Sequence, residues 1–193
     1  MHIADGVVPV EYCLLGYAVS LGGLYWFGRN ASSREISRMG LLAAATFTAS
    51  FIQFPVAGAS IHLGLFGLLG VLLRGRAFPA VFAALLLQTL LLSHGGLLSL
   101  GLNGLNMGGG ALAGWTVWSV RAAPAPLRAF AAGFIGSLLP ASLMAVEFWL
   151  SGYGKGFFVI TGVYTLVAAI EGAATVAIVG YLRRAKPEVF ATA

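Results

Sequence analysis

The sequence predicts an all-α polytopic membrane protein with about seven transmembrane helices. Of its 193 residues, 59% are hydrophobic and only 9% are charged, and the mean hydropathy is +0.92. Soluble domains carry about 25% charged residues. Apolar runs recur along the chain, and several could cross about 30 Å of hydrocarbon. This composition leaves no room for a sizeable soluble domain and predicts one transmembrane domain over residues 1–193.

Charged and proline-containing stretches mark where the first three spans end. A polar loop over 29–38 follows the first span, and Pro55 stops the second. A linker of small residues, 56–61, leads into a third span that ends at Arg74 and is unusually short. The predicted spans are 11–28, 39–55, 62–73, 78–93, 97–120, 129–150 and 158–182.

The later boundaries rest on turns and basic loops. His94-Gly95-Gly96 closes the fourth span, and the loop 121–128, broken by two prolines, separates the fifth from the sixth. The spans together form a helix bundle over 11–182, preceded by an N-terminal arm, 1–10, and followed by a cytoplasmic tail, 183–193.

The distribution of basic residues sets the predicted orientation. With seven spans, ten of the eleven Lys and Arg residues fall on one side of the membrane, and only Lys155 falls on the other. Because cytoplasmic loops carry the excess of Lys and Arg, the N-terminus is predicted outside and the C-terminus in the cytoplasm, in the inner membrane of the cell. All three histidines, His2, His62 and His94, then lie in the outer half.

The short third span places His62 below the outer surface. Twelve residues separate His62 from Arg74, which is about 18 Å of helix at about 1.5 Å per residue. An ionisable residue inside a membrane suggests a functional site. The alternative is an ordinary histidine at a helix end, bonded to a neighbouring carbonyl.

The first two residues offer three nitrogen donors. A metal bound by the Met1 amine, the His2 amide nitrogen and His2 Nδ1 would close a five-membered and a six-membered chelate ring, and nitrogen-rich planar sites suit Ni(II) or Cu(II). The opening residues have neither the basic start nor the apolar run of a signal peptide. The alternative is that a histidine follows the initiator methionine by chance.

Several motifs together resemble the CbiM/NikM family, the substrate-binding membrane components of energy-coupling-factor nickel and cobalt transporters. Met-His-Ile-Ala-Asp-Gly at 1–6 is similar to the family's start, and the segment at 55–62 is similar to its Pro-x-x-Gly-x-Ser-x-His element. The run at 88–107 resembles the family's series Gln-x-Leu-Leu, His-Gly-Gly-Leu, Leu-Gly-x-Asn and Asn-Met. Glu171-Gly172 resembles the family's late Glu-Gly element. Alanines stand at 57 and 59 where the family often has Pro and Thr.

The resemblance implies a function and a set of ligands. The N-terminal arm would fold into the bundle, and Met1, His2 and His62 would supply four nitrogens to Ni²⁺ or Co²⁺ as the transported substrate. The implied partners are a transmembrane coupling subunit and two cytoplasmic ATPases. Ala18 and Gly22 in the first span could give the coupling subunit a close helix contact.

Five further polar residues are candidates for support of the site or for the entry path. Asn103 and Asn106 share a helix face, and could hold the inserted arm or simply tie helices together. Ser60 could orient the histidine two residues later. Asp5 could hold the arm or cap a helix. His94 could contact the ligands, line the entry path or stand exposed in its turn.

Two acids also fall in predicted spans. Glu171 lies inside the last span, where a buried acid needs a partner that the sequence does not name. Glu147, near the outer end of the sixth span, is predicted to be interfacial.

The chain is not predicted to be an enzyme. It contains no Gly-x-x-x-x-Gly-Lys-(Ser/Thr) nucleotide-binding motif, so the energy for uptake would come from partners. An intramembrane hydrolase using Ser60 with His62, or Ser93 with His94, is a weaker alternative, since no Gly-x-Ser-x-Gly turn is present. A passive channel or structural subunit without an N-terminal metal site is the stronger one.

Overall fold

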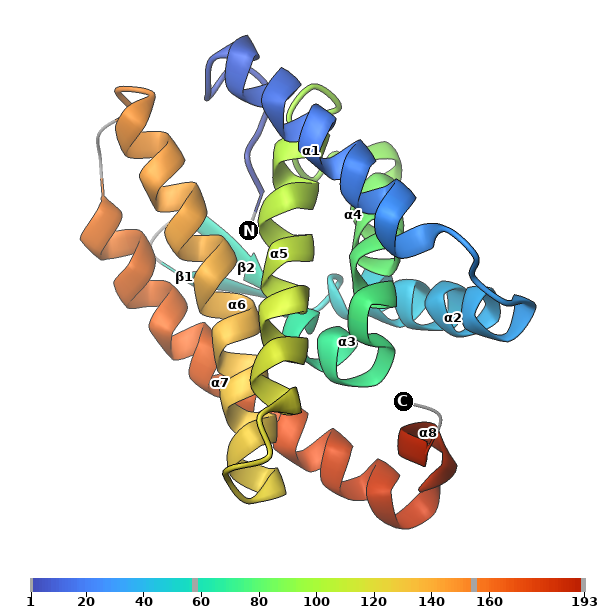
Figure 1. Ribbon diagram of the computed structural model, residues 1–193. Helices are drawn as coiled ribbons and strands as arrows, with labels where there is room; N and C mark the ends of the chain where they lie inside the picture. Colours follow the sequence, from blue (N-terminus) through green and yellow to red (C-terminus); the bar gives the residue numbers. More distant parts are fainter. Residues whose placement is uncertain (1, 57–58, 154–155, 192–193) are drawn as a thin grey trace.

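The computed structural model describes residues 2–56, 59–153 and 156–191 (Figure 1). The described residues are mostly helical, as the sequence predicts, with one two-stranded hairpin. The elements are α1 (Val10–Gly28), α2 (Ser33–Ala49), β1 (Gln53–Val56), β2 (Ala59–His62), α3 (Phe66–Leu73), the 3-10 turn η1 (Arg74–Arg76), α4 (Ala77–Leu92), α5 (Leu100–Ser119), α6 (Ala125–Leu150), α7 (Phe157–Ala185) and α8 (Glu188–Ala191).

Helix α2 begins and ends earlier than the predicted span 39–55. Its start is fixed by a capping box, in which Ser32 Oγ accepts from the Glu35 N–H at 3.3 Å and Glu35 Oε2 accepts from the Ser32 N–H at 2.8 Å. Ser-x-x-Glu is a recognised helix-start pattern, and here it lies inside the predicted polar loop. The helix ends at Ala49, so Pro55 does not terminate it.

The expected linker over 56–61 is replaced by part of a β-hairpin. Strands β1 and β2 pair antiparallel, with Gln53 opposite His62 and Pro55 opposite Ser60. Extended backbone inside a protein must satisfy its N–H and C=O groups, and a hairpin does so locally. His62 therefore ends a strand rather than beginning a helix, and α3 starts only at Phe66.

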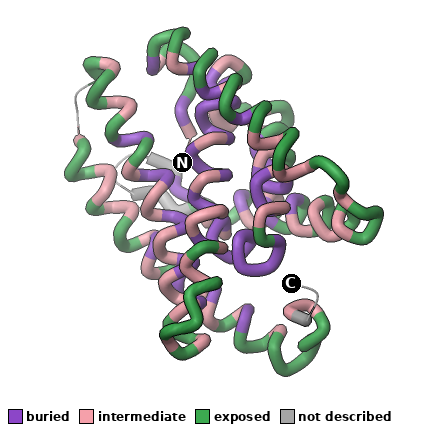
Figure 2. The backbone as a smooth tube through the Cα atoms, viewed as in Figure 1, coloured by how far each residue is buried: buried purple, intermediate pink, exposed green. Residues whose placement is uncertain are grey.

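Helix α3 is shorter still than the predicted span 62–73, and it is fully buried. All eight of its residues are buried, and Figure 2 shows burial concentrated on α3 and the central helix α5. A Cβ at Gly70 would lie 2.0 Å from the Ala111 carbonyl oxygen of α5, and one at Gly67 would lie 2.1 Å from the Ala132 oxygen of α6. Only glycine allows backbones to approach this closely.

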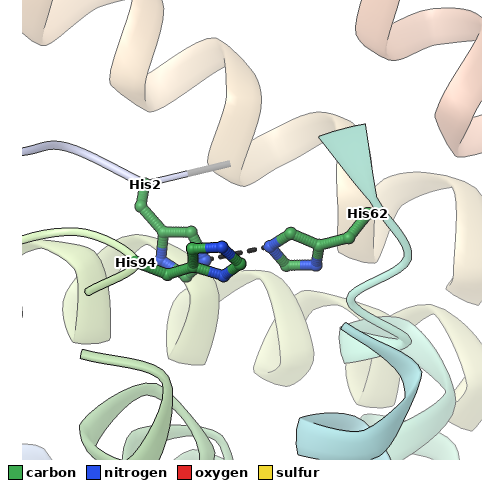
Figure 3. Close-up of side chains that lie close together, drawn as sticks. All are labelled: His2, His62 and His94. Atoms are coloured by element: carbon green, nitrogen blue, oxygen red, sulfur yellow. Dashed lines mark hydrogen bonds between the residues drawn. The ribbon is translucent and has the colours of Figure 1, made fainter. Parts of the chain in front are cut away.

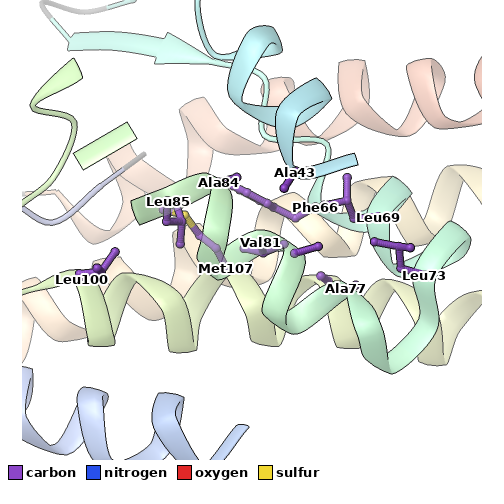
Figure 4. Packing of buried hydrophobic residues seen from close by; sticks show 12 residues of the cluster. Ala43, Phe66, Leu69, Leu73, Ala77, Val81, Ala84, Leu85, Leu100 and Met107 are labelled. Atoms are coloured by element: carbon purple, nitrogen blue, oxygen red, sulfur yellow. The ribbon is translucent and has the colours of Figure 1, made fainter. Parts of the chain in front are cut away.

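Apolar side chains from α3, α4 and α5 fill the core beneath the hairpin. Phe66 and Leu69 of α3 pack with Val81 of α4 and Met107 of α5, and all four are at most 4% exposed (Figure 4). Ala43 of α2 joins the same cluster, which ties the second helix to this core.

Within the described residues, three stretches are long and apolar enough to cross a membrane: Phe66–Leu92, Ala125–Leu150 and Phe157–Ala185. The first is not one straight span. The rings of His62 and His94, which flank it, lie 5.7 Å apart, so the chain must return to its starting level through the turn at Arg74, where φ is +56°. A membrane-type helical bundle is thus confirmed, whereas the count of seven spans and their orientation stay predictions.

Residues 183–191, within the predicted cytoplasmic tail 183–193, are folded against the helix bundle. Helix α7 continues to Ala185, and α8 folds back so that the Phe190 ring lies 6.3 Å from that of Trp118. Arg38 Nη2 donates to the carbonyl of Val189 at 3.3 Å and to that of Leu72 at 3.2 Å. The apolar residues Val189 and Phe190 of α8 pack against the end of the bundle. The basic residues just before them led us to predict a tail here instead.

Candidate metal site

The three histidines of the chain meet in one cluster (Figure 3). His2 comes from the N-terminal arm, His62 from the end of β2 and His94 from the loop after α4. Nε2 of His2 lies 3.0 Å from Nε2 of His62, and the rings of His62 and His94 are parallel within 6°. One nitrogen from each ring lies within 4.8 Å of the others. Three separate segments thus bring ligand atoms to one point.

The N-terminal arm reaches this point because α5 holds its backbone. The Ile3 N–H donates to Asn103 Oδ1 at 2.8 Å, and Asn103 Nδ2 donates to the Ile3 carbonyl at 2.9 Å. Ser99 Oγ donates to the same carbonyl at 2.6 Å. Ile3 is fully buried, so these bonds satisfy backbone groups that water cannot reach. The sequence-based role of Asn103 in supporting the arm is consistent with this geometry.

Asp5 has both of the roles that the sequence left open. Its carboxylate accepts from the Ser99 N–H at 2.8 Å and from the Leu98 N–H at 3.2 Å. These N–H groups belong to the start of α5, where an acid is favourable. Burial opposes ionisation of Asp5, but the two backbone donors outweigh it and hold the pKa of the carboxyl below its ordinary value. The same Asp5 carboxylate therefore caps the start of α5 and holds the arm against it.

The hydrogen bonds of His62 define which nitrogen carries its proton. Nδ1 lies 3.2 Å from the Leu63 carbonyl oxygen, and a carbonyl can only accept, so the proton is on Nδ1 and Nε2 presents a lone pair. His2 Nε2 must then donate to that lone pair, which leaves His2 Nδ1 unprotonated. Burial lowers the pKa of His2 well below its usual value, which favours the neutral ring. Neutral imidazole is the form that binds metals.

His94 lies in the cluster and not in a solvent-exposed turn. Its ring is half-buried, its Nε2 lies 3.2 Å from Gln53 Nε2, and burial lowers its pKa. His2, His62, His94 and Gln53 line a cavity of about 380 Å³. Gln53 was not among the candidates predicted from the sequence; it begins β1, four residues after the end of α2.

The other candidates divide between the site and the bundle. Asn106 Nδ2 donates to Glu147 Oε2 at 2.8 Å and ties α5 to α6, and no hydrogen bond joins Asn106 to residues 2–10, the described part of the arm. Glu147 is therefore half-buried and hydrogen-bonded within the bundle. Ser60 lies in β2, but its side chain falls outside the part of the chain that the structure describes, as does the whole of Met1.

Glu171 has the partners that the sequence could not name. It is 2% exposed, and its carboxylate accepts from the N–H groups of Gly64 and Leu65, at 2.5 and 2.9 Å, and from Ser137 Oγ at 2.6 Å. Two of these donors are backbone groups in the turn directly after His62, which no side-chain pattern could reveal.

Comparison with known proteins agrees with this picture. The family model CbiM, described as a cobalt uptake substrate-specific transmembrane region, matches residues 2–189. A putative fused nickel transport protein NikMN of Archaeoglobus fulgidus is 32% identical over 98% of this chain and 68% of its own length. The cobalt transport protein CbiM of Sorangium cellulosum is 30% identical over 98% of this chain and 94% of its own.

Solved structures show the same fold. A crystal structure of a truncated transition metal transporter superposes with a TM-score of 0.83 at 22% identity, covering 95% of this chain and 99% of the other. A second transition metal transporter gives 0.81 at 22% identity, covering 96% and 93%.

Proposed function

Since this chain belongs to the CbiM family, the cobalt uptake substrate-specific transmembrane regions, we propose that it captures Ni²⁺ or Co²⁺ in the histidine cluster at the end of its N-terminal arm. The observation that carries the proposal is the half-buried contact of His2 with His62, in which their Nε2 atoms lie 3.0 Å apart. Neutral imidazoles are good ligands for a borderline metal ion, and here two of them already have nitrogens this close to each other.

The donor set consists of four nitrogens. The Met1 amine, the His2 amide nitrogen and His2 Nδ1 form two fused chelate rings, and His62 Nε2 adds the fourth donor. The tautomers inferred from the hydrogen bonds support this set, because they leave a lone pair on His2 Nδ1, and His62 Nε2 would exchange its bond from His2 Nε2–H for the metal ion. Such a site favours Ni(II) or Co(II) over hard ions such as Mg²⁺. His94, in the same cavity, is an entry ligand on the path inward.

Uptake also needs an energy source outside this chain. Two relatives are named as putative fused transport proteins, one for nickel (NikMN) and one for cobalt (CbiMQ), which supports a transporter of several components. We assign this chain the substrate-binding role beside a transmembrane coupling subunit and two cytoplasmic ATPases. Ala18 and Gly22 are exposed on α1, and no described atom lies within 4 Å of a Cβ built at Gly22, so this face is open to the coupling subunit.

The proposed orientation places the metal site outside and the basic loops in the cytoplasm. Arg38, Arg74 and Arg76 come from two loops assigned to the cytoplasmic side, and together they line one cavity of about 330 Å³ with Trp26 and Trp115. Basic residues beside tryptophans are typical of the cytoplasmic interface of an inner-membrane protein.

The test measures equilibrium Ni²⁺ and Co²⁺ binding by the purified protein in detergent. Three samples are compared: protein with a free Met1 amine, protein with extra residues ahead of Met1, and His62→Ala. We expect the last two to lose more than about 100-fold in affinity, since outer-shell partners alone are worth about 10- to 100-fold.

A cleavable extension supplies the matched control. Protease removal that regenerates Met1 should restore binding, which separates loss of the amine from loss of the fold. If the extended protein binds as tightly as the free one, the chelate is wrong; a passive channel or structural subunit would show no dependence on the amine.

A further inference from the structure

One peptide group connects Glu171 to the ring of His62. The Leu63–Gly64 peptide presents its N–H to Glu171 Oε1 at 2.5 Å and its C=O to His62 Nδ1 at 3.2 Å. Both ends of a single planar unit are therefore used, one by an acid of α7 and the other by the histidine of β2. A rotation of this plane would break both hydrogen bonds at once.

The acid holds the plane firmly. Glu171 is 2% exposed and takes two successive backbone donors, Gly64 and Leu65, together with Ser137 from α6. Every one of these partners donates, so the carboxylate acts only as an acceptor, as an ionised carboxylate does. Successive N–H groups pointing at one anion form a compact nest.

The backbone conformation of the turn shows that it is held in place. Leu65 has φ +54°, in the left-handed region that residues with a side chain rarely occupy. Such a conformation persists where the surroundings determine it. The Leu65 N–H donates to Glu171 at 2.9 Å, which ties this turn to α7 three residues from His62.

We propose that Glu171 is a positioning residue of the metal site, acting on His62 through the Leu63–Gly64 peptide. This inference rests on the proposed function. The carboxylate fixes the carbonyl, the carbonyl keeps the proton of His62 on Nδ1, and Nε2 is left to bind the metal. Carboxylates orient ligand histidines directly in many metal sites; here a peptide group stands between the two.

The hydrogen bond to the acid also strengthens the ligand. A charge-assisted bond at the N–H polarises the peptide and makes its carbonyl a better acceptor. The stronger Nδ1–H bond raises the basicity of Nε2. Glu171 therefore contributes to metal affinity although its own oxygens are occupied by the turn and by Ser137.

The first test reads the His62 tautomer in metal-free protein. The chain has three histidines, so histidine-selective ¹⁵N labelling gives a resolvable set of imidazole signals. We expect the wild type to show His62 with Nδ1 protonated and Glu171→Gln to shift this population toward Nε2–H. Glu147→Gln makes the same chemical change at an acid that bonds Asn106 instead, and should leave the signal unchanged.

The second test measures Ni²⁺ affinity of the same variants. Glu171→Gln should lose about 10- to 100-fold, the usual effect of an outer-shell partner, while Glu147→Gln keeps wild-type affinity. Gly64→Ala is a second variant, for use if Glu171→Gln does not fold. Its Cβ would lie 2.3 Å from the Phe66 ring and would disturb the same peptide. It should reproduce both the shift of the His62 tautomer and the loss of Ni²⁺ affinity.

The two proposals fail in different ways. If Glu171→Gln keeps both the His62 tautomer and the Ni²⁺ affinity of the wild type, the positioning role is overturned. If binding proves independent of the N-terminal amine, the proposed function fails, and the tautomer signals of the metal-free protein still decide the role of Glu171.

Discussion

Replacing Asn103 with Leu removes the contact that docks the N-terminal arm on α5. Asn103 is 2% exposed, and its amide makes two bonds to the Ile3 backbone, at 2.8 and 2.9 Å. Leucine has similar size but neither donor nor acceptor. The Ile3 carbonyl keeps its bond from Ser99 Oγ, whereas its N–H loses the Asn103 acceptor inside the protein.

The size of the effect follows from those two bonds. An intramolecular hydrogen bond contributes about 1 kcal/mol net, and a buried donor left unpaired costs about 1–3 kcal/mol. The free energy of docking the arm should therefore weaken by about 2–4 kcal/mol. Each 1.4 kcal/mol or so corresponds to about a tenfold change in the docking equilibrium constant. Apparent metal affinity falls with the docked fraction, so the expected loss lies between about 10-fold and 1000-fold, according to how fully the wild-type arm is docked.

The assay is isothermal titration of Ni²⁺ into purified protein, with thermal unfolding measured in parallel. Asn106→Leu is the matched control, because it makes the same change three residues further along α5 but loses a bond to Glu147. It should lower the unfolding temperature without changing Ni²⁺ affinity. Equal loss of affinity in both variants, or none in Asn103→Leu, would refute docking by Asn103.

Two further predictions concern the arm and the cytoplasmic end. Gly96→Ala places a Cβ 1.9 Å from Asp5 Oδ1; the carboxylate must leave the start of α5, and Ni²⁺ affinity should fall about tenfold, or about 1.4 kcal/mol. At the other end, bonds from the Ser32 N–H and the Arg76 side chain lower the pKa of Glu35 to about 2. A carboxyl whose pKa is lower in the folded protein stabilises the fold at pH values above its pKa in the unfolded chain. Glu35→Gln should therefore lower the unfolding temperature at about pH 7. This difference should vanish as the pH falls from about 4.5 toward 2.

Each of these has its own check. Gly109→Ala changes another glycine near the middle of α5, where no described atom lies within 4 Å of the new Cβ, and should bind Ni²⁺ as the wild type does. For Glu35, unfolding temperatures of the wild type and the variant that differ equally at pH 7 and pH 3 would show that its ionised form does not stabilise the fold.

The sequence predicted the class of fold and the members of the histidine cluster for physical reasons that act locally. Hydropathy identified the helices, and the short stretch between His62 and Arg74 predicted that His62 lies below the membrane surface; within the protein, His62 is 7% exposed. The three histidines meet in the structure because α3 and α4 form a hairpin that returns the chain to the level of His62, while the arm folds back against α5.

What the sequence could not predict depends on backbone groups. The partners of Glu171 and Asp5 are N–H groups of turns, which every residue type except proline carries. The β-hairpin was missed because its strands are four residues each and include Pro55. The start of α2 was missed for a different reason: the Ser32 and Glu35 pattern was present, but the surrounding charge was interpreted as loop.

The two histidines of the proposed chelate are fixed to different helices. His2 is held through Ile3 by Asn103 of α5, whereas His62 is held through the Leu63–Gly64 peptide by Glu171 of α7. Helix α6 lies between these two helices and packs extensively against both. The distance between the ligands is therefore set by the spacing of α5 and α7 rather than by the arm alone. A partner that changed this spacing would separate His2 from His62 without unfolding either anchor, and a bound ion would lose donors from one side first.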